Sequence, residues 1–180
     1  AGLVTVATAE SAIALVAAHA PELMTEPLAE TAGGGIALEA LSSGRLTALL
    51  ANKDVVAIGP GLGTSQETVE LVRRLVAECA LPMVVDADGL NALAGTEFQG
   101  HALTLTPHPG EMSRLAGTMT QEVQADRVGV ARRFAMARGA TLVLKGQRTL
   151  IAFPDGRVWI NPTGTPAMAS GGSGDILTGL

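Results

Sequence analysis

Short apolar runs alternate with longer stretches of helical spacing along the whole chain. Residues 54–59 and 81–85 are almost wholly apolar, as strands of a parallel sheet are when helices cover both faces. Such alternation predicts an α/β fold with a mainly parallel sheet. Further strands are predicted over residues 3–7, 102–106 and 141–144, helices over 11–20, 36–50, 64–80, 89–94 and 120–138, and a loop over 21–35.

The last part of the chain predicts antiparallel pairing. Residues 149–153 and 158–160 contain β-branched side chains and flank residues 154–157, a Pro-Asp-Gly turn signal, so we expect a late hairpin. Residues 171–177 have the pattern of a helix start. Because the chain opens on a strand pattern and closes inside an expected helix, we expect one domain over residues 1–180 with elements missing at both ends.

Composition excludes several classes of protein. With 47% apolar and 16% charged residues, the chain is too hydrophobic for a disordered segment. The 12 Lys and Arg residues are scattered among 17 acidic ones, and aromatics make up 2%, which argues against a nucleic-acid-binding surface. Apolar stretches are too short for a membrane span, and no secretory leader pattern is present, so a cytoplasmic protein is expected. The single cysteine, Cys79, excludes an internal disulfide and is predicted to be a buried structural thiol.

Ligands of open parallel sheets bind beyond the carboxyl ends of the strands, so the segments after each strand are the candidates for a site. Residues 59–63 form a glycine-rich turn before residues 64–67, which have capping-box spacing. Glycines let a ligand approach the backbone, although a tight strand–helix turn would look the same. Asp86 and Asp88 follow the next strand; one is expected to face the site and the other to cap a helix, with a metal role through water left open.

Two further strand ends carry polar side chains. His108 lies between two prolines, so a stiffened backbone directs it toward the same edge of the sheet and favours a ligand contact. Lys145 begins a segment of donors that ends at Thr149, which would suit a nucleotide phosphate or ribose. A solvated turn is the alternative for that segment.

Residues 161–177 carry the strongest local signal. Small residues over 169–174 expose consecutive backbone N–H groups where a helix begins, which predicts an anion hole. Asp175, at that helix start, can act as a general base toward a substrate hydroxyl while the N–H groups hold a phosphoryl group. A simple helix cap is the alternative role for Asp175.

As a set, these motifs resemble the ribokinase-like superfamily and, within it, the ADP/ATP-dependent NAD(P)H-hydrate dehydratases. The Gly-Pro-Gly-Leu-Gly turn alone is weak, but Thr-Pro-His-Pro-Gly-Glu, Asp-Ala-Asp-Gly-Leu-Asn and Gly-Gly-Ser-Gly-Asp together are specific. The resemblance implies a three-layer α/β/α fold. It rests on residues 1–8, 59–63, 85–91, 105–111, 144–146 and 161–177, in the expected order.

The resemblance implies a hydro-lyase of metabolite repair, which returns the S epimer of hydrated NADH or NADPH to the reduced nucleotide. ADP or ATP would phosphorylate the ring hydroxyl, Mg²⁺ would bridge the phosphates through ligands that are not assigned, and phosphate would then leave. It also implies a tetramer and an epimerase domain fused in many bacterial relatives. Asp175 would be the base; Gly61, Gly63 and His108 would join it in binding the hydrated substrate; Lys145, Gly146, Gln147, Arg148, Thr149 and Gly174 would hold ADP or ATP.

Four positions depart from the family pattern. Thr165 and Ala167 stand where Asn and Gly are common, and Gln147 and Arg148 stand where small residues are common, which changes the expected nucleotide contacts. A ribokinase-like kinase acting on a hydroxyethylthiazole or hydroxymethylpyrimidine would share the anion hole and Asp175 but release a stable phosphate ester. A non-catalytic nucleotide-binding domain is disfavoured, because Asp175 and the glycine run are intact.

Overall fold

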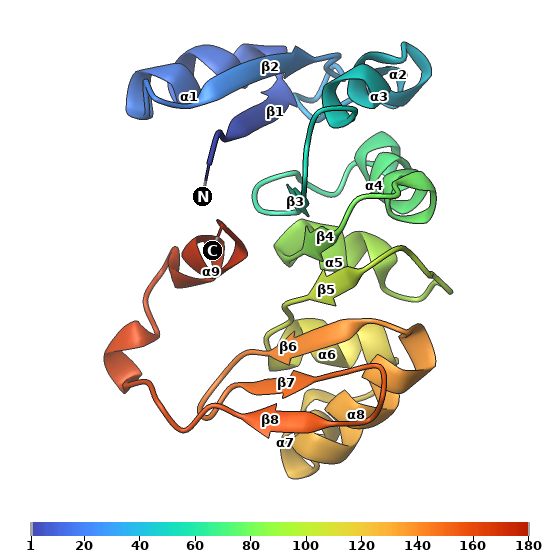
Figure 1. The fold of residues 1–180 in the computed structure, drawn as a ribbon, viewed down its shortest axis with the longest axis vertical. Coiled ribbons are helices and arrows are strands. Elements are labelled where there is room, and N and C mark those ends of the chain that lie inside the picture. Colours follow the sequence, from blue (N-terminus) through green and yellow to red (C-terminus); the bar gives the residue numbers. More distant parts are fainter. Residues whose placement is uncertain (1, 180) are drawn as a thin grey trace. The chain divides into compact units, whose positions relative to one another are not determined.

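The computed structural model describes residues 2–179, which divide into two compact units (Figure 1). Among the described residues, the first unit comprises 2–53 and 62–71, and the second comprises 54–61 and 72–179. The prediction of one domain over residues 1–180 stays a prediction, and its two end residues lie outside the described residues. No helix within residues 2–179 is both long and apolar enough to cross a membrane.

A parallel strand pair organises the described part of the first unit. β1 (Thr5–Ala9) pairs with β2 (Met24–Leu28), and the connection contains a short 3₁₀ helix, η1 (Glu10–Ala12), and α1 (Ile13–His19). Two short helices follow, α2 (Glu39–Ser42) and α3 (Arg45–Leu50). The buried core consists of Leu28, Ile36, Ala40, Leu46 and Leu71.

Two predictions for the first unit were wrong. Residues 21–35 were expected to form a loop, but they contain β2. Pro27 is tolerated there because β2 pairs only with β1 within the described chain, so one edge needs no N–H donor. The helix expected over 36–50 is split at Ser43 and Gly44, since glycine is a poor helix former.

A six-stranded sheet forms the centre of the second unit, as far as the chain is described, in the order β3-β4-β5-β6-β7-β8. The first four strands are parallel and the last two form an antiparallel hairpin, so the predicted mainly parallel sheet with a late hairpin is confirmed (Figure 1). Val85, Leu105 and Leu144 are completely buried, as the apolar runs predicted. The strands are β3 (Val56–Ile58), β4 (Met83–Val85), β5 (Leu103–Leu105), β6 (Thr141–Leu144), β7 (Leu150–Ala152) and β8 (Val158–Ile160).

Helices connect the parallel strands of this sheet. Residues of α4 (Gln66–Glu78) are divided between the two units, and the last described elements are a 3₁₀ helix, η2 (Pro166–Met168), and the helix at the predicted helix start. The helices of the second unit are α5 (Ala87–Leu93), α6 (Pro109–Ala116), α7 (Thr120–Ala125), α8 (Arg127–Arg138) and α9 (Ser173–Gly179).

Several helix boundaries differ from prediction. α6 was missed because its start, Pro-His-Pro-Gly, has the composition of a loop. The helix expected over 120–138 breaks at Asp126, whose carboxylate accepts the N–H of Gly129 and begins α8. The cap of α4 is Ser65, one residue after the predicted one, since its hydroxyl accepts the N–H of Thr68. Cys79 is only partly buried, so the prediction of a buried thiol was wrong.

Candidate functional site

A buried carboxylate joins the end of β4 to the end of β6 and to α9. Asp86 directly follows β4 and is 1% exposed. One of its carboxylate oxygens accepts from Lys145 Nζ at 2.7 Å, and the other accepts from Thr178 Oγ1 at 2.8 Å. Lys145 directly follows β6, and Thr178 lies on α9. One side chain therefore fixes three elements that are distant in sequence.

The surroundings of Asp86 favour its charged form. Burial by itself raises the pKa of the Asp86 carboxyl. The opposing effect is larger and comes from hydrogen bonds with Lys145, Thr178 and the backbone N–H of Ala87, together with the Lys145 charge. The pKa therefore lies below the ordinary value of 3.8. Asp86 precedes α5, and apart from the contact with Ala87, the first residue of that helix, its carboxylate makes no capping bond to the described residues of α5. Of the two aspartates after β4, Asp86 is thus the one that pairs with Lys145 at the strand ends.

A second buried carboxylate faces the same ammonium group. Glu111 on α6 is 6% exposed, and its Oε2 lies 3.8 Å from Lys145 Nζ. The same Oε2 accepts the backbone N–H of His108 at 2.7 Å. The Lys145 ammonium group therefore lies between two buried carboxylates.

His108 caps α6. Its Nδ1 accepts the N–H groups of Gly110 at 3.0 Å and Glu111 at 3.3 Å, which completes a capping box and requires an unprotonated Nδ1. Its side chain is about half exposed (52%), and its Nε2 lies 3.5 Å from Glu111 Oε1. The predicted substrate contact stays a prediction. The cap was overlooked because histidine is an uncommon capping residue, although Glu111, three residues on, was a signal for it.

The first turn of α9 lies against the Asp86–Lys145 pair. A Cβ placed on Gly174 would lie 3.5 Å from Lys145 Nζ and 3.7 Å from Asp86 Oδ2. The structure thus brings Gly174 and Lys145, both predicted to hold nucleotide, to one place. Asp175 is the next residue of α9 and is exposed, as a base that receives a substrate proton must be. Residues 161–172 are exposed and include η2 with Ala167.

The predicted nucleotide segment after β6 is an exposed turn over residues 146–148. Arg127, at the start of α8, donates to the carbonyl groups of Leu144, Lys145 and Gln147. Arg127, Glu111 and Thr178 were not among the predicted site residues. Arg127 and Thr178 act through contacts between elements, which no local pattern marks, whereas Glu111 could have been found as the capping-box partner of His108.

The glycine-rich turn after β3 packs against the same strand end. Gly59 has a φ of +133°, and a Cβ there would lie 1.8 Å from the Asp86 carbonyl oxygen, so only glycine fits. Gly61, with a φ of +70°, has open space around it. Gly61 belongs to the second unit and Gly63 to the first, so their joint contact with a substrate stays a prediction.

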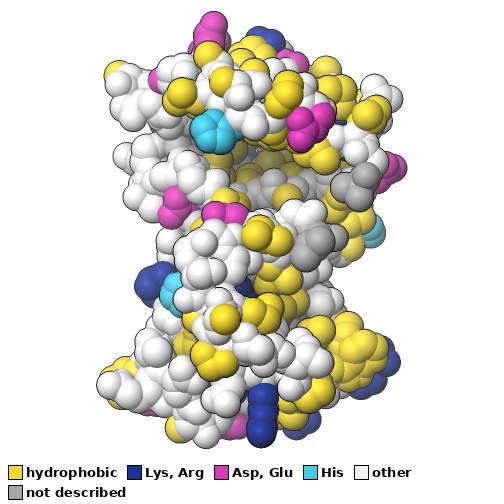
Figure 2. Space-filling view, turned by 90° about the vertical axis from the view of Figure 1, so that its left-hand side faces the viewer, with side chains coloured by type: hydrophobic (Ala, Val, Ile, Leu, Met, Phe, Trp, Pro, Cys, Tyr) yellow, Lys and Arg dark blue, Asp and Glu magenta, His cyan; other side chains and the backbone are white. Residues whose placement is uncertain are grey.

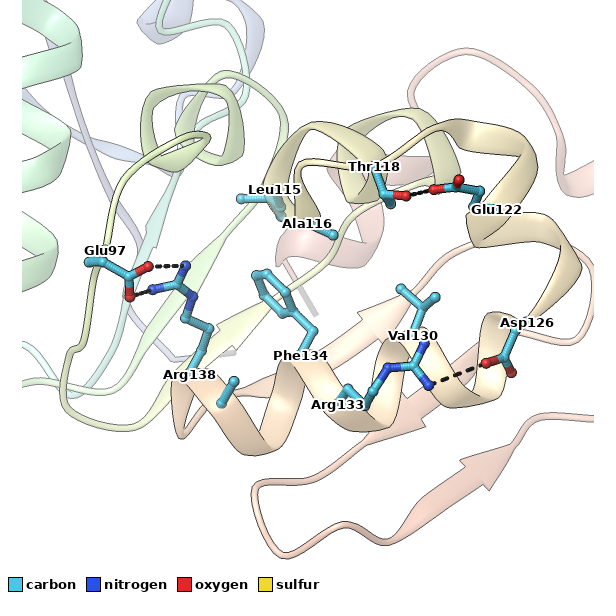
Figure 3. Close-up of a pocket in the computed structure, with 11 residues that line it drawn as sticks. Glu97, Leu115, Ala116, Thr118, Glu122, Asp126, Val130, Arg133, Phe134 and Arg138 are labelled. Atoms are coloured by element: carbon cyan, nitrogen blue, oxygen red, sulfur yellow. Dashed lines mark hydrogen bonds and ion pairs between the residues drawn. The ribbon is translucent and has the colours of Figure 1, made fainter.

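A cavity of about 500 Å³ lies elsewhere in the second unit, among α6, α7 and α8 (Figure 3). Its charged lining residues are engaged with neighbours: Arg138 with Glu97, and Arg133 with Asp126. None of the described lining residues belongs to the predicted site. Within residues 2–179 no cluster of three or more His, Cys, Asp or Glu side chains is arranged to hold a metal ion.

The expectation that the chain binds no nucleic acid stays a prediction. On the face that Figure 2 shows, Lys and Arg side chains are scattered among hydrophobic and acidic ones. A nucleic-acid-binding surface would gather them.

Comparison with known proteins assigns the chain to a family. A family model described as NAD(P)H-hydrate dehydratase matches residues 1–180. The bifunctional NAD(P)H-hydrate repair enzyme Nnr of Moorella thermoacetica is 49% identical over 185 residues, which cover 100% of this chain and 34% of that protein. The chain thus spans about a third of the length of this curated relative.

Solved structures share the fold. A crystal structure of ADP/ATP-dependent NAD(P)H-hydrate dehydratase from Bacillus subtilis, co-crystallised with ATP/Mg²⁺ and soaked with CoA, has a TM-score of 0.76 at 33% identity, covering 99% of this chain and 61% of that one. A ribokinase-like superfamily protein from Enterococcus faecalis has a TM-score of 0.80 at 28% identity, covering 99% and 59%. The predicted ribokinase-like α/β fold is confirmed.

Proposed function

The chain belongs to the NAD(P)H-hydrate dehydratase family, and from this premise we propose that it returns the S epimer of hydrated NADH or NADPH to NADH or NADPH, with hydrolysis of ADP or ATP. The observation that carries the proposal is the family match over the whole chain. The convergence of Lys145, Gly174 and the buried Asp86 at one strand end supports it. The match to dehydratases favours this activity over the small-molecule kinase.

In the proposed reaction, Asp175 removes the proton of the hydroxyl on the hydrated ring. The hydroxyl oxygen then forms a bond to the terminal phosphorus of the nucleotide, while the bond from that phosphorus to the AMP or ADP leaving group breaks. The phosphorylated oxygen departs as phosphate, and loss of a proton from the neighbouring ring carbon restores the double bond. Phosphorylation is required because hydroxide is a poor leaving group.

The chain's own residues bind and orient the two nucleotides in this proposal. Lys145, Gly146, Gln147, Arg148, Thr149 and Gly174 hold ADP or ATP, while Gly61, Gly63, His108 and Asp175 contact the hydrated substrate. Two carboxylates, Asp86 and Glu111, face the single ammonium group of Lys145, so these three side chains together carry one net negative charge. They do not neutralise a polyphosphate by themselves.

Mg²⁺ fits this site as an ion carried by the phosphates. Both Asp86 oxygens accept hydrogen bonds, from Lys145 and Thr178, and the residue is 1% exposed, so we do not assign this carboxylate as a ligand of the ion. When bound, Mg²⁺ supplies neutralisation of the phosphoryl oxygens, and it commonly keeps phosphate and water ligands.

The test is recovery of reduced-nicotinamide absorbance from hydrated NADH by the full-length protein, with Mg²⁺ and either ADP, ATP or no nucleotide. We expect recovery only with nucleotide, and a fall of at least about a hundredfold in Asp175→Asn without loss of stability, because the side chain is exposed. Asp155→Asn, an exposed carboxylate of the β7–β8 turn, is the matched control. A folded, nucleotide-binding protein that produces no recovery would refute the proposal.

The length of the curated relative supports a further proposal. Because that relative is bifunctional and the match covers 34% of it, we propose that an epimerase domain belongs to the same polypeptide. Interconversion of the two epimers of hydrated NADH by the full-length protein, without nucleotide, tests this. The predicted tetramer and cytoplasmic location stay predictions.

A further inference from the structure

The turn after β6 has its carbonyl groups held by side chains. Arg127 Nη2 donates to the carbonyl oxygens of Leu144 and Lys145, both at 3.2 Å, and Nη1 donates to that of Gln147. Thr149 Oγ1 donates to the carbonyl oxygen of Gly146 at 3.1 Å. Four consecutive carbonyl groups, 144 to 147, therefore accept side-chain hydrogen bonds, three of them from one guanidinium group.

This arrangement sets the direction of the peptide N–H groups. In a planar trans peptide the carbonyl of one residue and the N–H of the next point in opposite directions. The N–H groups of Lys145, Gly146 and Arg148 therefore point away from Arg127. That of Lys145 donates to the Pro107 carbonyl oxygen at 2.8 Å. The N–H groups of Gly146 and Arg148 lie in the exposed turn, and backbone N–H groups of turns are a known means of binding anions.

The backbone of the turn is shaped to fit the guanidinium group. Gly146 has a φ of +130°, and a Cβ there would lie 3.2 Å from Arg127 Nη2. Arg148 has a φ of +54°, which is uncommon for a residue with a side chain. The unusual backbone persists because Arg127 and Thr149 hold the carbonyl groups on either side of it.

Arg127 also places an uncompensated positive charge behind the turn. Its described partners are carbonyl oxygens, and no carboxylate among the described residues forms an ion pair with it. Burial lowers the pKa of the Arg127 guanidinium below its ordinary value, but a guanidinium group stays protonated in proteins. The charge favours an anion on the far side of the turn.

We propose that Arg127 is a positioning residue for nucleotide binding, which holds residues 144–148 so that the N–H groups of Gly146 and Arg148 face the phosphate groups of ADP or ATP. The identity of the ligand rests on the proposed function. Arg127 acts through the turn and does not itself touch the nucleotide.

The test compares Arg127→Met with Arg132→Met in the full-length protein. Arg132 is the matched control because it lies on the same helix and also donates to a turn carbonyl, that of Gly156 at 3.0 Å. Calorimetric titration with ADP and ATP, each with Mg²⁺, gives the affinities. We expect Arg127→Met to weaken nucleotide binding about tenfold or more, equivalent to at least one hydrogen bond to a charged group, and Arg132→Met to leave it unchanged.

Steady-state kinetics distinguish positioning from general destabilisation. Arg127→Met should raise the KM for nucleotide and leave the KM for hydrated NADH unchanged. Partial unfolding would instead lower the fraction of active enzyme without raising the KM for nucleotide selectively. Arg127→Lys should give an intermediate affinity, because one ammonium group cannot reproduce the planar fork that reaches three carbonyls. If Arg127→Met does not fold, Arg127→Lys decides: an affinity equal to that of the wild type overturns the proposal.

The outcomes separate this proposal from the proposed function. A wild-type protein that binds ADP but does not dehydrate hydrated NADH refutes the activity, and the affinity comparison still decides the role of Arg127. A dehydratase in which Arg127→Met binds nucleotide as well as the wild type overturns the role of Arg127. A folded wild-type protein that binds neither ADP nor ATP overturns both.

Discussion

Replacing Asp86 by Asn removes the charge of the buried carboxylate while keeping its shape. Removing one partner of a buried ion pair costs about 3–5 kcal/mol, because the other charge is left uncompensated. Here Glu111 remains 3.8 Å from Lys145 Nζ, and the Asn oxygen can still accept one of the two donors. We therefore expect the lower end, a loss of about 3 kcal/mol, or roughly 6–12 °C in Tm for a domain of this size.

The pH dependence of this loss follows from the sign of the pKa shift. The pKa of Asp86 is lower in the folded protein than its ordinary value of 3.8. Its charge therefore stabilises the fold at pH values above the unfolded pKa, and that stabilisation disappears as the pH falls through the folded value. The difference between wild type and Asp86→Asn should be constant from about pH 7 to 5 and shrink below about pH 4.

Urea denaturation of both proteins across this pH range measures the difference, provided that circular dichroism and fluorescence report one coincident transition. Glu97→Gln is the control, since Glu97 pairs with Arg138 but its side chain is 93% exposed, and it should change stability by less than about 1 kcal/mol. Equal stability of wild type and Asp86→Asn at pH 7, or a difference that grows toward acid pH, would show that the ion pair does not stabilise the fold as argued.

Four other substitutions, at three positions, test the strand ends. His108→Ala should lower the free energy of unfolding by about 1 kcal/mol because it removes the cap of α6, and His108→Asn should restore Tm because Asn is a good cap. If His108 also contacts the substrate, both variants should have a KM for hydrated NADH that differs from the wild-type value. An unchanged KM in both variants argues against the contact. Gly59→Ala should lower the free energy of unfolding by at least about 3 kcal/mol, because its Cβ would meet the Asp86 carbonyl oxygen. Gly61→Ala has open space around it and should lose about 1 kcal/mol, because of its positive φ alone. Thermal denaturation compares the two alanine variants, and equal losses would contradict the steric argument.

The central strands β4, β5 and β6 were predictable because they are apolar runs whose side chains are buried or partly buried. The prediction for β6, residues 141–144, agrees with the structure at both ends, and the hairpin strands were found from their turn signal. β2 was missed because it contains polar residues and Pro27, which only a strand with an unpaired edge accepts. α6 was missed because its first turn is formed by loop-favouring residues that His108 and Glu111 together cap.

The site was predictable only where its residues follow strands directly. Lys145 and Gly174 could be named because each stands at the boundary of an element, but the partners that hold Lys145 are 59 and 34 positions away in sequence. A carboxylate that directly follows a wholly apolar strand enters a region of low dielectric, where its charge must be paired. That argument requires a donor for Asp86 without identifying which one. Lys145 and Thr178 meet this requirement only once β4 and β6 are in one sheet and α9 packs against their ends, so the pairing is a property of the fold.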